Sequence, residues 1–270
     1  MIGAIIGDTI GSIFEHDNIK TKDFHLFSKS SKLTDDSIMT LAVGEVIMDR
    51  NYHDKDIIID TLKKWGRAYP DRGYGCHFYE WLMSDDRNSY NSLGNGAAMR
   101  VSPAGDFGLT ASQVKEMSYA VTSVTHSHEE GLLGAEVVAL SIYYARIGKS
   151  KEFIEKYVSF YYDIDLDYDE LVKNYQYDVT SKGTVPVAVF CFLISEDFED
   201  AIRTAISIGG DSDTIASITG AIAEAYYKEI PKYMIDEIIK RLPEPKDGCD
   251  PRKIIDRYID SKDYLKELYQ

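Results

Sequence analysis

The sequence predicts an all-α fold: a single domain over residues 1–270, built as an orthogonal bundle of many helices. Apolar residues recur at helical spacing through most of the chain, whereas the two-residue alternation typical of β-strands is nearly absent. The chain has neither a linker rich in proline, glycine or serine nor an internal repeat of about 20–50 residues. These three observations favour one helical domain over two.

The N-terminal segment is the first predicted element. Gly3, Gly7 and Gly11 recur every four residues and therefore share one helix face, which indicates close packing against another helix. Residues 36–48 are apolar on too many faces for a surface helix, and they follow a Thr-Asp-Asp sequence of the kind that begins helices. We expect a buried helix there. Residues 69–98 are predicted to form a long functional loop.

Seven further helices are predicted from apolar spacing together with start and stop signals. Pro186, Pro231 and Pro251 lie at the start of three of them, and a Gly-Gly pair ends another. The segment 130–147 is apolar on several faces and is expected at the centre of the bundle. The predicted ranges are 112–124, 130–147, 185–194, 198–208, 214–227, 232–242 and 251 to about 269.

Charge and composition exclude several classes of protein. The chain carries 30 Lys+Arg against 45 Asp+Glu, a net charge of −15, whereas binding to nucleic acid phosphates or to a membrane surface needs clustered basic residues. No stretch approaches the roughly 18 apolar residues of a membrane span. Three scattered cysteines without a CxxC motif, and no signal-peptide features, lead us to expect a cytoplasmic protein.

Two acidic segments carry the strongest chemical signal. Thr34-Asp35-Asp36-Ser37 and Asp211-Ser212-Asp213-Thr214 each open an apolar helix. Helix capping explains either segment taken singly, because Ser, Thr and Asp are favoured at helix starts. Together they offer carboxylates and threonine hydroxyls, hard oxygen ligands that suit Mg²⁺, Mn²⁺ or Ca²⁺. If the two helices converge, these carboxylates would repel one another unless cations neutralise them, and their number suits two ions.

A turn of small residues is the second candidate. Gly94-Asn95-Gly96 lacks the bulk that would keep a ligand from the backbone, so its N–H groups can reach anionic oxygens. A plain turn before a helix explains the same residues equally well. The turn matches neither the P-loop nor the dinucleotide fingerprint. Gly73 and Gly75 lie in the same loop region.

Three polar residues admit either a chemical or a structural role. His126 and His128 are close in sequence, but zinc would need further ligands at recognisable spacing. A substrate-binding histidine or a helix cap is therefore favoured. Glu15 follows the N-terminal helix and is either a functional carboxylate or a solvated acid.

Taken together, these segments resemble the ADP-ribosylglycohydrolase family. The matching stretches occur in the family's order across about the first 230 residues. They are GAIIGDTIGSIFE (3–15), TDDS (34–37), GYG (73–75), GNGAAMRVSP (94–103), VTH (124–126) and GGDSDTIA (209–216).

The resemblance implies an all-α fold of that family's type and a centre of two divalent cations, Mg²⁺ or Mn²⁺. It implies catalytic roles for Glu15 and Asp36, because Glu15 matches the family's carboxylate near the scissile bond. The implied metal ligands are Thr34, Asp35, Asp36, Asp211, Asp213 and Thr214. The implied substrate-binding residues are Gly73, Gly75, Ser92, Gly94, Asn95, Gly96 and His126, of which Ser92 and the Gly-Asn-Gly turn match the pyrophosphate-binding loop.

Two positions depart from the family pattern. Leu93 stands where relatives often carry a Tyr or Phe that stacks on adenine, although Tyr90 is close by. Ser181 and Lys182 stand where the family often has Cys-Gln, and they are candidates for tuning the choice of acceptor.

The expected function is metal-dependent hydrolysis of the glycosidic bond between ADP-ribose and a modified acceptor. Such cleavage passes through an oxocarbenium-like state that a carboxylate can stabilise. The expected partner is an ADP-ribosylated protein or small molecule, modified on arginine, serine or another group. Nucleic acid enters only as a modified acceptor, and no membrane partner is expected. Two alternatives remain: a two-metal phosphohydrolase acting on a nucleotide pyrophosphate, and a catalytically silent ADP-ribose-binding relative.

Overall fold

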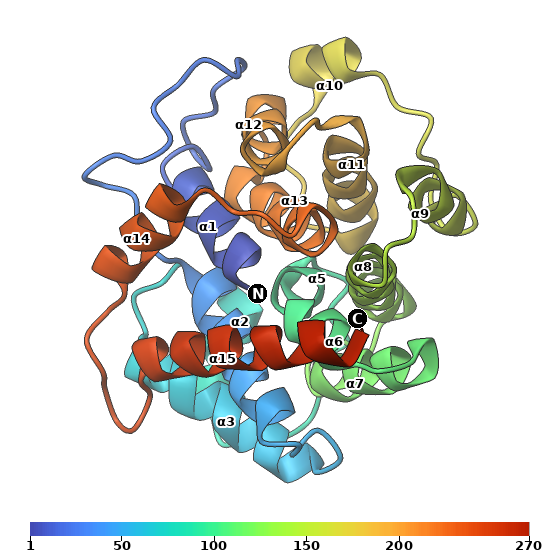
Figure 1. Cartoon of the computed structure of the whole chain (residues 1–270). Coiled ribbons are helices and arrows are strands. Elements are labelled where there is room, and N and C mark those ends of the chain that lie inside the picture. Colours follow the sequence, from blue (N-terminus) through green and yellow to red (C-terminus); the bar gives the residue numbers. More distant parts are fainter. Residues whose placement is uncertain (270) are drawn as a thin grey trace.

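Helices make up nearly all the regular structure of the computed structural model, which describes the backbone of residues 1–269 and the side chains of residues 1–262 (Figure 1). Strand-like pairing within the described residues is confined to two isolated bridges, Gly94 with Thr180 and Lys246 with Cys249. The predicted all-α class is therefore confirmed. The helices are α1 (Ile2–Gly11), α2 (Asp35–Met48), α3 (Lys55–Ala68), α4 (Cys76–Met83), α5 (Gly96–Arg100), α6 (Ser102–Phe107), α7 (Ala111–Ser123), α8 (Glu129–Arg146), α9 (Lys151–Val158), α10 (Tyr168–Asn174), α11 (Ser181–Ile194), α12 (Phe198–Ile208), α13 (Ser212–Tyr227), α14 (Lys232–Arg241) and α15 (Pro251–Tyr269).

The packing of α1 against α13 forms the middle of the molecule. A Cβ atom added at Gly7 would lie 2.0 Å from the carbonyl oxygen of Ala216, and one at Gly11 would lie 2.5 Å from the Cα of Asp213. Only glycine allows backbones to approach so closely. The close packing predicted for the glycine face of α1 is thus present, and it places the end of α1 beside the start of α13.

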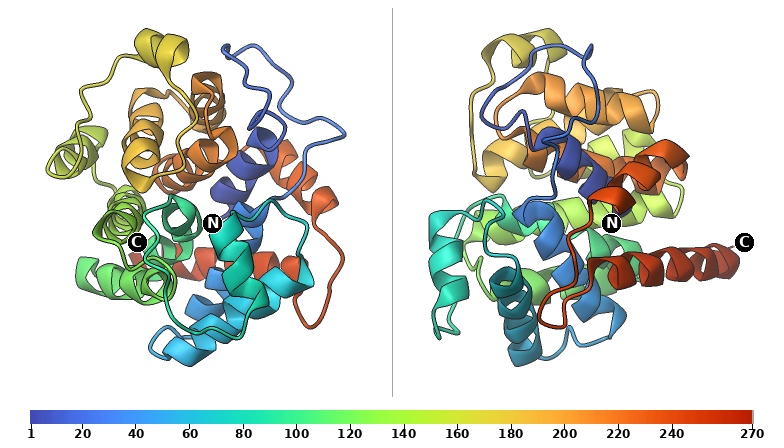
Figure 2. Two further views of the ribbon diagram at one scale, coloured as in Figure 1. Left: turned by 180° about the vertical axis from the view of Figure 1, so that it is seen from behind. Right: turned by 90° about the vertical axis from the view of Figure 1, so that its left-hand side faces the viewer.

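The other buried helices surround this pair. Figure 1 shows α11 and α12 on one side of α13, and α2 and α15 beyond α1 on the other. The buried apolar side chains form one cluster that extends from Met1 to Tyr258. Seen from behind (Figure 2, left panel), α4 and the chain that leads into α5 lie at the front of the molecule.

Two expectations need correction. The segment 69–98 is not one long loop, because α4 forms within it and buries Phe78, Trp81 and Leu82 at helical spacing. Helix α11 begins at Ser181, so Pro186 lies inside the helix rather than in its first turn. The Thr180 hydroxyl accepts a hydrogen bond from the Gly183 N–H at 3.0 Å, which starts the helix earlier.

Helix α3 is absent from the predicted helices, although the sequence contains the signals that predict it. The Asp54 side chain caps it by accepting from the N–H of Asp56 at 2.9 Å, and its buried side chains recur at helical spacing. None of the helices in the described residues has both the length and the apolar character needed to cross a bilayer. All three cysteines are free thiols, of which Cys191 and Cys249 are buried.

Candidate active site

The two acidic helix openings lie together at one end of the α1–α13 pair. Helix α2 begins at Asp35 and α13 at Ser212. The Thr214 hydroxyl, in the first turn of α13, lies 3.4 Å from Asp36 Oδ1 and donates to it. Segments almost 180 residues apart in the sequence therefore present their carboxylates to the same small volume.

Three carboxylates from this end of the molecule form a compact group. One oxygen from each of Glu15, Asp211 and Asp213 lies within 4.8 Å of the other two. Asp211 and Asp213 are buried, and Glu15 is half-buried at the edge of the group. Oxygens at such mutual distances can hold a hard cation between them.

Capping accounts for one of the two helix starts but not for the other. The Thr34 hydroxyl accepts from the Asp36 N–H at 3.3 Å, as expected of a helix cap. Asp211 stands at the cap position of α13, yet its side chain makes no capping hydrogen bond there. The Asp211 carboxylate is thus directed elsewhere, which favours a functional role over a capping one.

Burial and mutual repulsion both disfavour the charged forms of these carboxyl groups. Burial, followed by the charges of neighbouring carboxylates, raises the pKa values of Asp35, Asp36 and Asp213 well above the ordinary range. Asp36 Oδ2 is buried and has no hydrogen-bond partner among the described residues. A buried acceptor left in this state is costly. An all-oxygen donor set of this kind fits divalent cations such as Mg²⁺ and Mn²⁺.

Asn95 joins the small-residue turn to the acidic group. Its side-chain amide donates to Asp211 Oδ2 at 2.6 Å and to the Thr184 hydroxyl at 3.0 Å. Burial raises the pKa of Asp211, and the hydrogen bonds from Asp213 and Asn95 oppose that shift. The side chain expected to contact substrate therefore also holds a carboxylate in place.

Asp8 is a buried carboxylate beside the start of α2 that the sequence reasoning did not single out. Its Oδ1 accepts from the Thr34 hydroxyl at 2.6 Å and its Oδ2 from the Thr34 N–H at 2.9 Å, and the Ser37 hydroxyl also donates to Oδ2. Burial raises the pKa of Asp8 to about 6, despite these hydrogen bonds. The sequence did offer one signal for Asp8, since it is a lone carboxylate inside the otherwise apolar, glycine-rich segment that forms α1.

The predicted pyrophosphate loop forms a turn beside His126. The Ser92 hydroxyl accepts from the Gly94 N–H at 3.1 Å, and a Cβ at Gly96 would lie 3.5 Å from His126 Nε2. The Asn95 N–H donates to the Val179 carbonyl at 2.8 Å, so the turn is fastened to the segment before α11. Ser92, the turn and His126 thus lie together.

His126 is held as a neutral imidazole. Burial, with a smaller contribution from Arg100, lowers its pKa well below the ordinary value. Its Nδ1 is 2.8 Å from the Thr125 hydroxyl, and the Tyr90 ring lies 6.1 Å away between centroids. His128 instead caps α8 by accepting from the Glu130 N–H at 3.2 Å. The capping alternative is confirmed for His128.

Gly73 and Gly75 differ in their relation to the acidic group. Gly73 has a φ of +96°, which favours glycine, and a Cβ there would lie 3.4 Å from Asp35 Oδ1. Its neighbour Arg72 accepts from the Asp35 N–H at 2.9 Å through its carbonyl oxygen. A Cβ added at Gly75 would have no neighbouring atom of the described residues within 4 Å.

Two residues beside Glu15 had no signal in the sequence. The Tyr177 hydroxyl donates to Glu15 Oε1 at 3.0 Å. The Asn18 amide donates to the Glu15 carbonyl at 3.1 Å and to the Gly210 carbonyl at 2.9 Å. The Tyr177–Glu15 and Asn18–Gly210 contacts join chain segments that only folding brings together.

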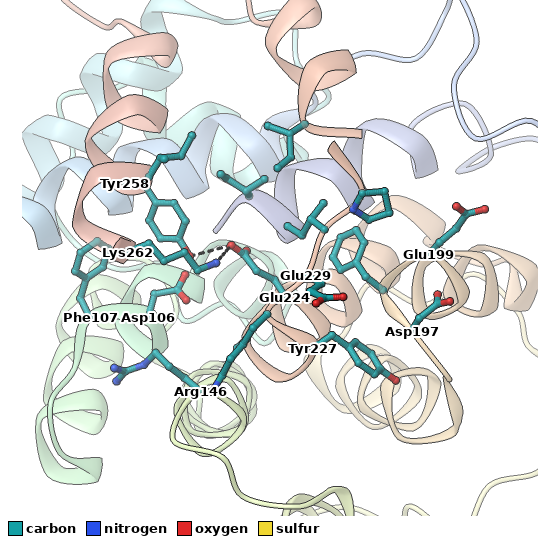
Figure 3. Close-up of a pocket in the computed structure, with 18 of the residues that line it drawn as sticks. Asp106, Phe107, Arg146, Asp197, Glu199, Glu224, Tyr227, Glu229, Tyr258 and Lys262 are labelled. Carbon is teal, nitrogen blue, oxygen red and sulfur yellow. Dashed lines mark hydrogen bonds and ion pairs between the residues drawn. The ribbon is translucent and has the colours of Figure 1, made fainter. Parts of the chain in front are cut away.

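A cavity of about 1170 Å³ lies near the opposite end of α13 (Figure 3). Glu224, which lines it, is 11 residues after Asp213 on one helix, or about 16 Å along the axis. Figure 3 shows Tyr258 and Lys262 directed at the Glu224 carboxylate, to which both donate hydrogen bonds. This cavity contains none of the predicted site residues.

The fold and the site together define a class of protein: an all-helical chain in which buried carboxylates from two helix starts converge. Comparison with known protein families identifies the family within this class. Residues 1–265 match the ADP-ribosylglycohydrolase family, and the chain belongs to that family. At the level of the family, the chain is therefore an ADP-ribosylhydrolase enzyme.

Similar proteins cover most of the chain at low identity. The ADP-ribosylhydrolase ARH3 of Xenopus tropicalis is 29% identical, over 85% of this chain and 86% of its own length. The ARH3 of Mus musculus is 26% identical, over 84% and 82%. A putative ADP-ribosyl glycohydrolase, L543, of Acanthamoeba polyphaga mimivirus is 26% identical, over 88% and 89%.

A solved structure shares the fold. It is described as an ADP-ribosylglycohydrolase-related protein complex, and it aligns with a TM-score of 0.66 and 23% identity. The alignment covers 89% of this chain and 94% of the other. At this identity the likeness establishes the fold.

Proposed function

We propose that this chain is a metal-dependent hydrolase that cleaves the glycosidic bond between ADP-ribose and a modified acceptor. The observation that carries the proposal is the buried group of Asp36, Asp211 and Asp213 with Glu15 at its edge. The relatives named as ADP-ribosylhydrolases support the reaction class. A cytoplasmic location remains part of the proposal, on the sequence composition.

The residues proposed to hold two divalent cations share oxygen donors and a common place in the fold. They are Thr34, Asp35, Asp36, Asp211, Asp213 and Thr214. Asp36 Oδ2 has no partner in the part of the chain that the structure describes, and the carboxyl pKa values are raised. Both support a cation there, because positive charge would remove the repulsion between the carboxylates. When bound, such ions supply Lewis-acid polarisation of hydroxyl groups and of water.

Glu15 and Asp36 are the proposed catalytic carboxylates. Glu15 is half-buried beside Asp211 and Asp213 and reaches the surface, so it can face both a bound sugar and water. There it would stabilise positive charge at the anomeric carbon or accept a proton from the attacking water. Asp36 would orient groups at the buried side of the same site.

The Ser92–Gly96 turn is proposed to bind the pyrophosphate through its N–H groups. The neutral imidazole of His126 lies against this turn, where its Nε2 can share a hydrogen bond with substrate. The Tyr90 ring packs against the core, and its centroid lies 6.1 Å from that of the His126 ring. It is the nearby aromatic group for stacking on adenine. Gly73 and Gly75 complete the proposed substrate contacts.

The test is release of ADP-ribose from a panel of modified acceptors, carrying arginine, serine, nucleobase or small-molecule linkages. We expect free ADP-ribose, detected by mass spectrometry, with Mg²⁺ or Mn²⁺ present, and no release after chelation. Glu15→Gln should lower kcat by about 10²–10⁴-fold while ADP-ribose still binds. AMP with ribose phosphate as products would support the phosphohydrolase alternative, and binding without turnover would support a silent relative.

A further inference from the structure

Tyr177 contacts the one proposed catalytic carboxylate that reaches the surface. Its hydroxyl donates to Glu15 Oε1 at 3.0 Å, although its side chain is 52% exposed. Burial of the hydroxyl, with the nearby charges of Asp211 and Glu15, raises the pKa of Tyr177, so the phenol stays protonated as a donor. This contact restricts the direction of a side chain that would otherwise have several rotamers at the rim of the site.

The segment that carries Tyr177 is fastened on both sides. The Val179 carbonyl accepts from Asn95, and the Ser181 N–H donates to the Leu93 carbonyl at 3.0 Å. On the other side, a Cβ at Gly210 would lie 2.5 Å from the Tyr175 ring. Tyr177 therefore projects from a segment wedged between the small-residue turn and the Gly209-Gly210 turn.

Asn18 fixes the backbone of the same carboxylate. Its Nδ2 donates to the carbonyls of Phe14 at 2.6 Å and Glu15 at 3.1 Å. It also exchanges two hydrogen bonds with Gly210, donating to the carbonyl at 2.9 Å and accepting from the N–H at 2.8 Å. Gly210 directly precedes Asp211, so Asn18 sets the turn of Glu15 at a defined distance from the buried carboxylates.

We propose that Tyr177 and Asn18 are positioning residues that hold Glu15 against the Asp211–Asp213 pair, Tyr177 through the carboxylate and Asn18 through the backbone. The inference rests on the proposed hydrolase function of the site. Tyr177 also couples Glu15 to the turn proposed to bind the pyrophosphate, because its segment is hydrogen-bonded to that turn.

Tyr177→Phe is the principal test because it removes the hydroxyl and keeps the ring. We expect kcat to fall about tenfold, the effect of losing one hydrogen bond to a charged group. KM and ADP-ribose affinity should stay within about twofold. In the Glu15→Gln background, Tyr177→Phe should cause no further loss, because the two residues act through one group. A crystal structure of Tyr177→Phe should show the Glu15 carboxylate displaced and Asp211 unmoved.

Tyr233→Phe is the matched control. Tyr233 is 47% exposed, and its hydroxyl donates to Glu199 Oε2 at 2.7 Å, the same kind of tyrosine–glutamate contact outside the site. We expect wild-type kcat for this variant. An equal loss in both variants, or a Tyr177→Phe kcat within twofold of wild type, would overturn the role of Tyr177.

Asn18→Ala tests the backbone contact. We expect at least a tenfold fall in kcat that disappears in the Glu15→Gln background. A loss of the same size in that background would show that Asn18 acts through Gly210 and Asp211, and would overturn its role toward Glu15. If wild type released no ADP-ribose from any acceptor, the proposed function would fail. The position of Glu15 in the Tyr177→Phe crystal structure would then still decide whether Tyr177 orients it.

Discussion

The buried carboxylates at the two ends of α13 lie in opposite electrostatic surroundings. At its start, Asp213 faces other carboxylates, and burial with their charges raises its pKa. Near its end, Glu224 accepts from the Gly3 N–H at 2.7 Å, from the Met1 amino group at 2.9 Å and from Lys262. Burial alone would raise the pKa of Glu224, but the attraction of Lys262 and the amino group lowers it below the ordinary value.

The difference separates a structural carboxylate from a functional one. Asp213 and Glu224 are both buried on the same helix, so burial by itself does not mark a site. Glu224 has its positive partners within the chain, whereas the group around Asp213 would need cations from solution. We infer that a group of buried carboxylates that face one another indicates a ligand-binding site.

The largest effect is expected from Glu224→Gln. The substitution removes one of the two carboxylates that pair with the buried Met1 amino group and leaves the other, Asp106 Oδ2, at 2.6 Å. Breaking a buried ion pair from one side typically costs about 3–5 kcal/mol. We expect the free energy of unfolding to fall by about 3 kcal/mol, measured by urea denaturation with an unchanged m-value. A change below about 1 kcal/mol would mean that this end of α13 is not stabilised by its charges.

Asp213→Asn is the matched substitution at the other end. Removing one of the repelling charges should leave the metal-free protein no less stable than wild type. In wild type, Mg²⁺ at 100 times its dissociation constant should add about 2.7 kcal/mol to the free energy of unfolding. The gain should be smaller in Asp213→Asn, as followed by calorimetry with chelator and with metal. An equal metal-induced rise in Tm for both proteins would remove Asp213 from the metal site.

A more gradual effect is expected with pH, because protons can neutralise the carboxylates one at a time. The raised pKa of Asp8, from 3.8 to about 6, means that the folded protein binds more protons than the unfolded chain across that interval. Its stability contribution is therefore lost as pH rises through about 6. Glu224 acts in the opposite sense, since its lowered pKa makes its contribution disappear as pH falls below 4.5.

The measurable consequence is a stability maximum between these two ranges. With chelator present, Tm should be highest near about pH 5 and should decline toward pH 8. Saturating Mg²⁺ should remove the decline, because it compensates the ionised carboxylates. A chelated protein whose Tm rises steadily from pH 5 to pH 8 would contradict the assigned repulsion.

The smallest effect is expected from Gly96→Ala. A Cβ there would lie 3.5 Å from His126 Nε2, an ordinary van der Waals distance, so stability should change by less than about 0.5 kcal/mol. The added methyl group should still weaken ADP-ribose binding a few-fold, because it stands where the turn is proposed to approach the pyrophosphate. Calorimetric titration of ADP-ribose in Mg²⁺ measures this. Unchanged affinity would place the pyrophosphate elsewhere.

Local patterns in the sequence determined the helices and pointed to the acidic segments. Apolar spacing and capping residues identify a helix without reference to the rest of the chain. The same is true of the glycine face of α1, whose close packing against α13 the structure shows. The sequence-based prediction was wrong where it overlooked such patterns, at α3, α4, α9 and α10. It was also wrong where a cap at Thr180 outweighed the signal of Pro186.

Only the tertiary structure decided which residues surround Glu15 and the buried aspartates. Tyr177 lies 162 residues after Glu15 in the chain, and Asn95 lies 116 residues before Asp211. Neither Tyr177 nor Asn95 lies in a local sequence pattern that predicts its partner, because a hydrogen bond between distant side chains depends on how whole helices pack. The charges of the aspartates were visible in the sequence, but their raised pKa values arise from burial and mutual distance, which exist only in the folded protein.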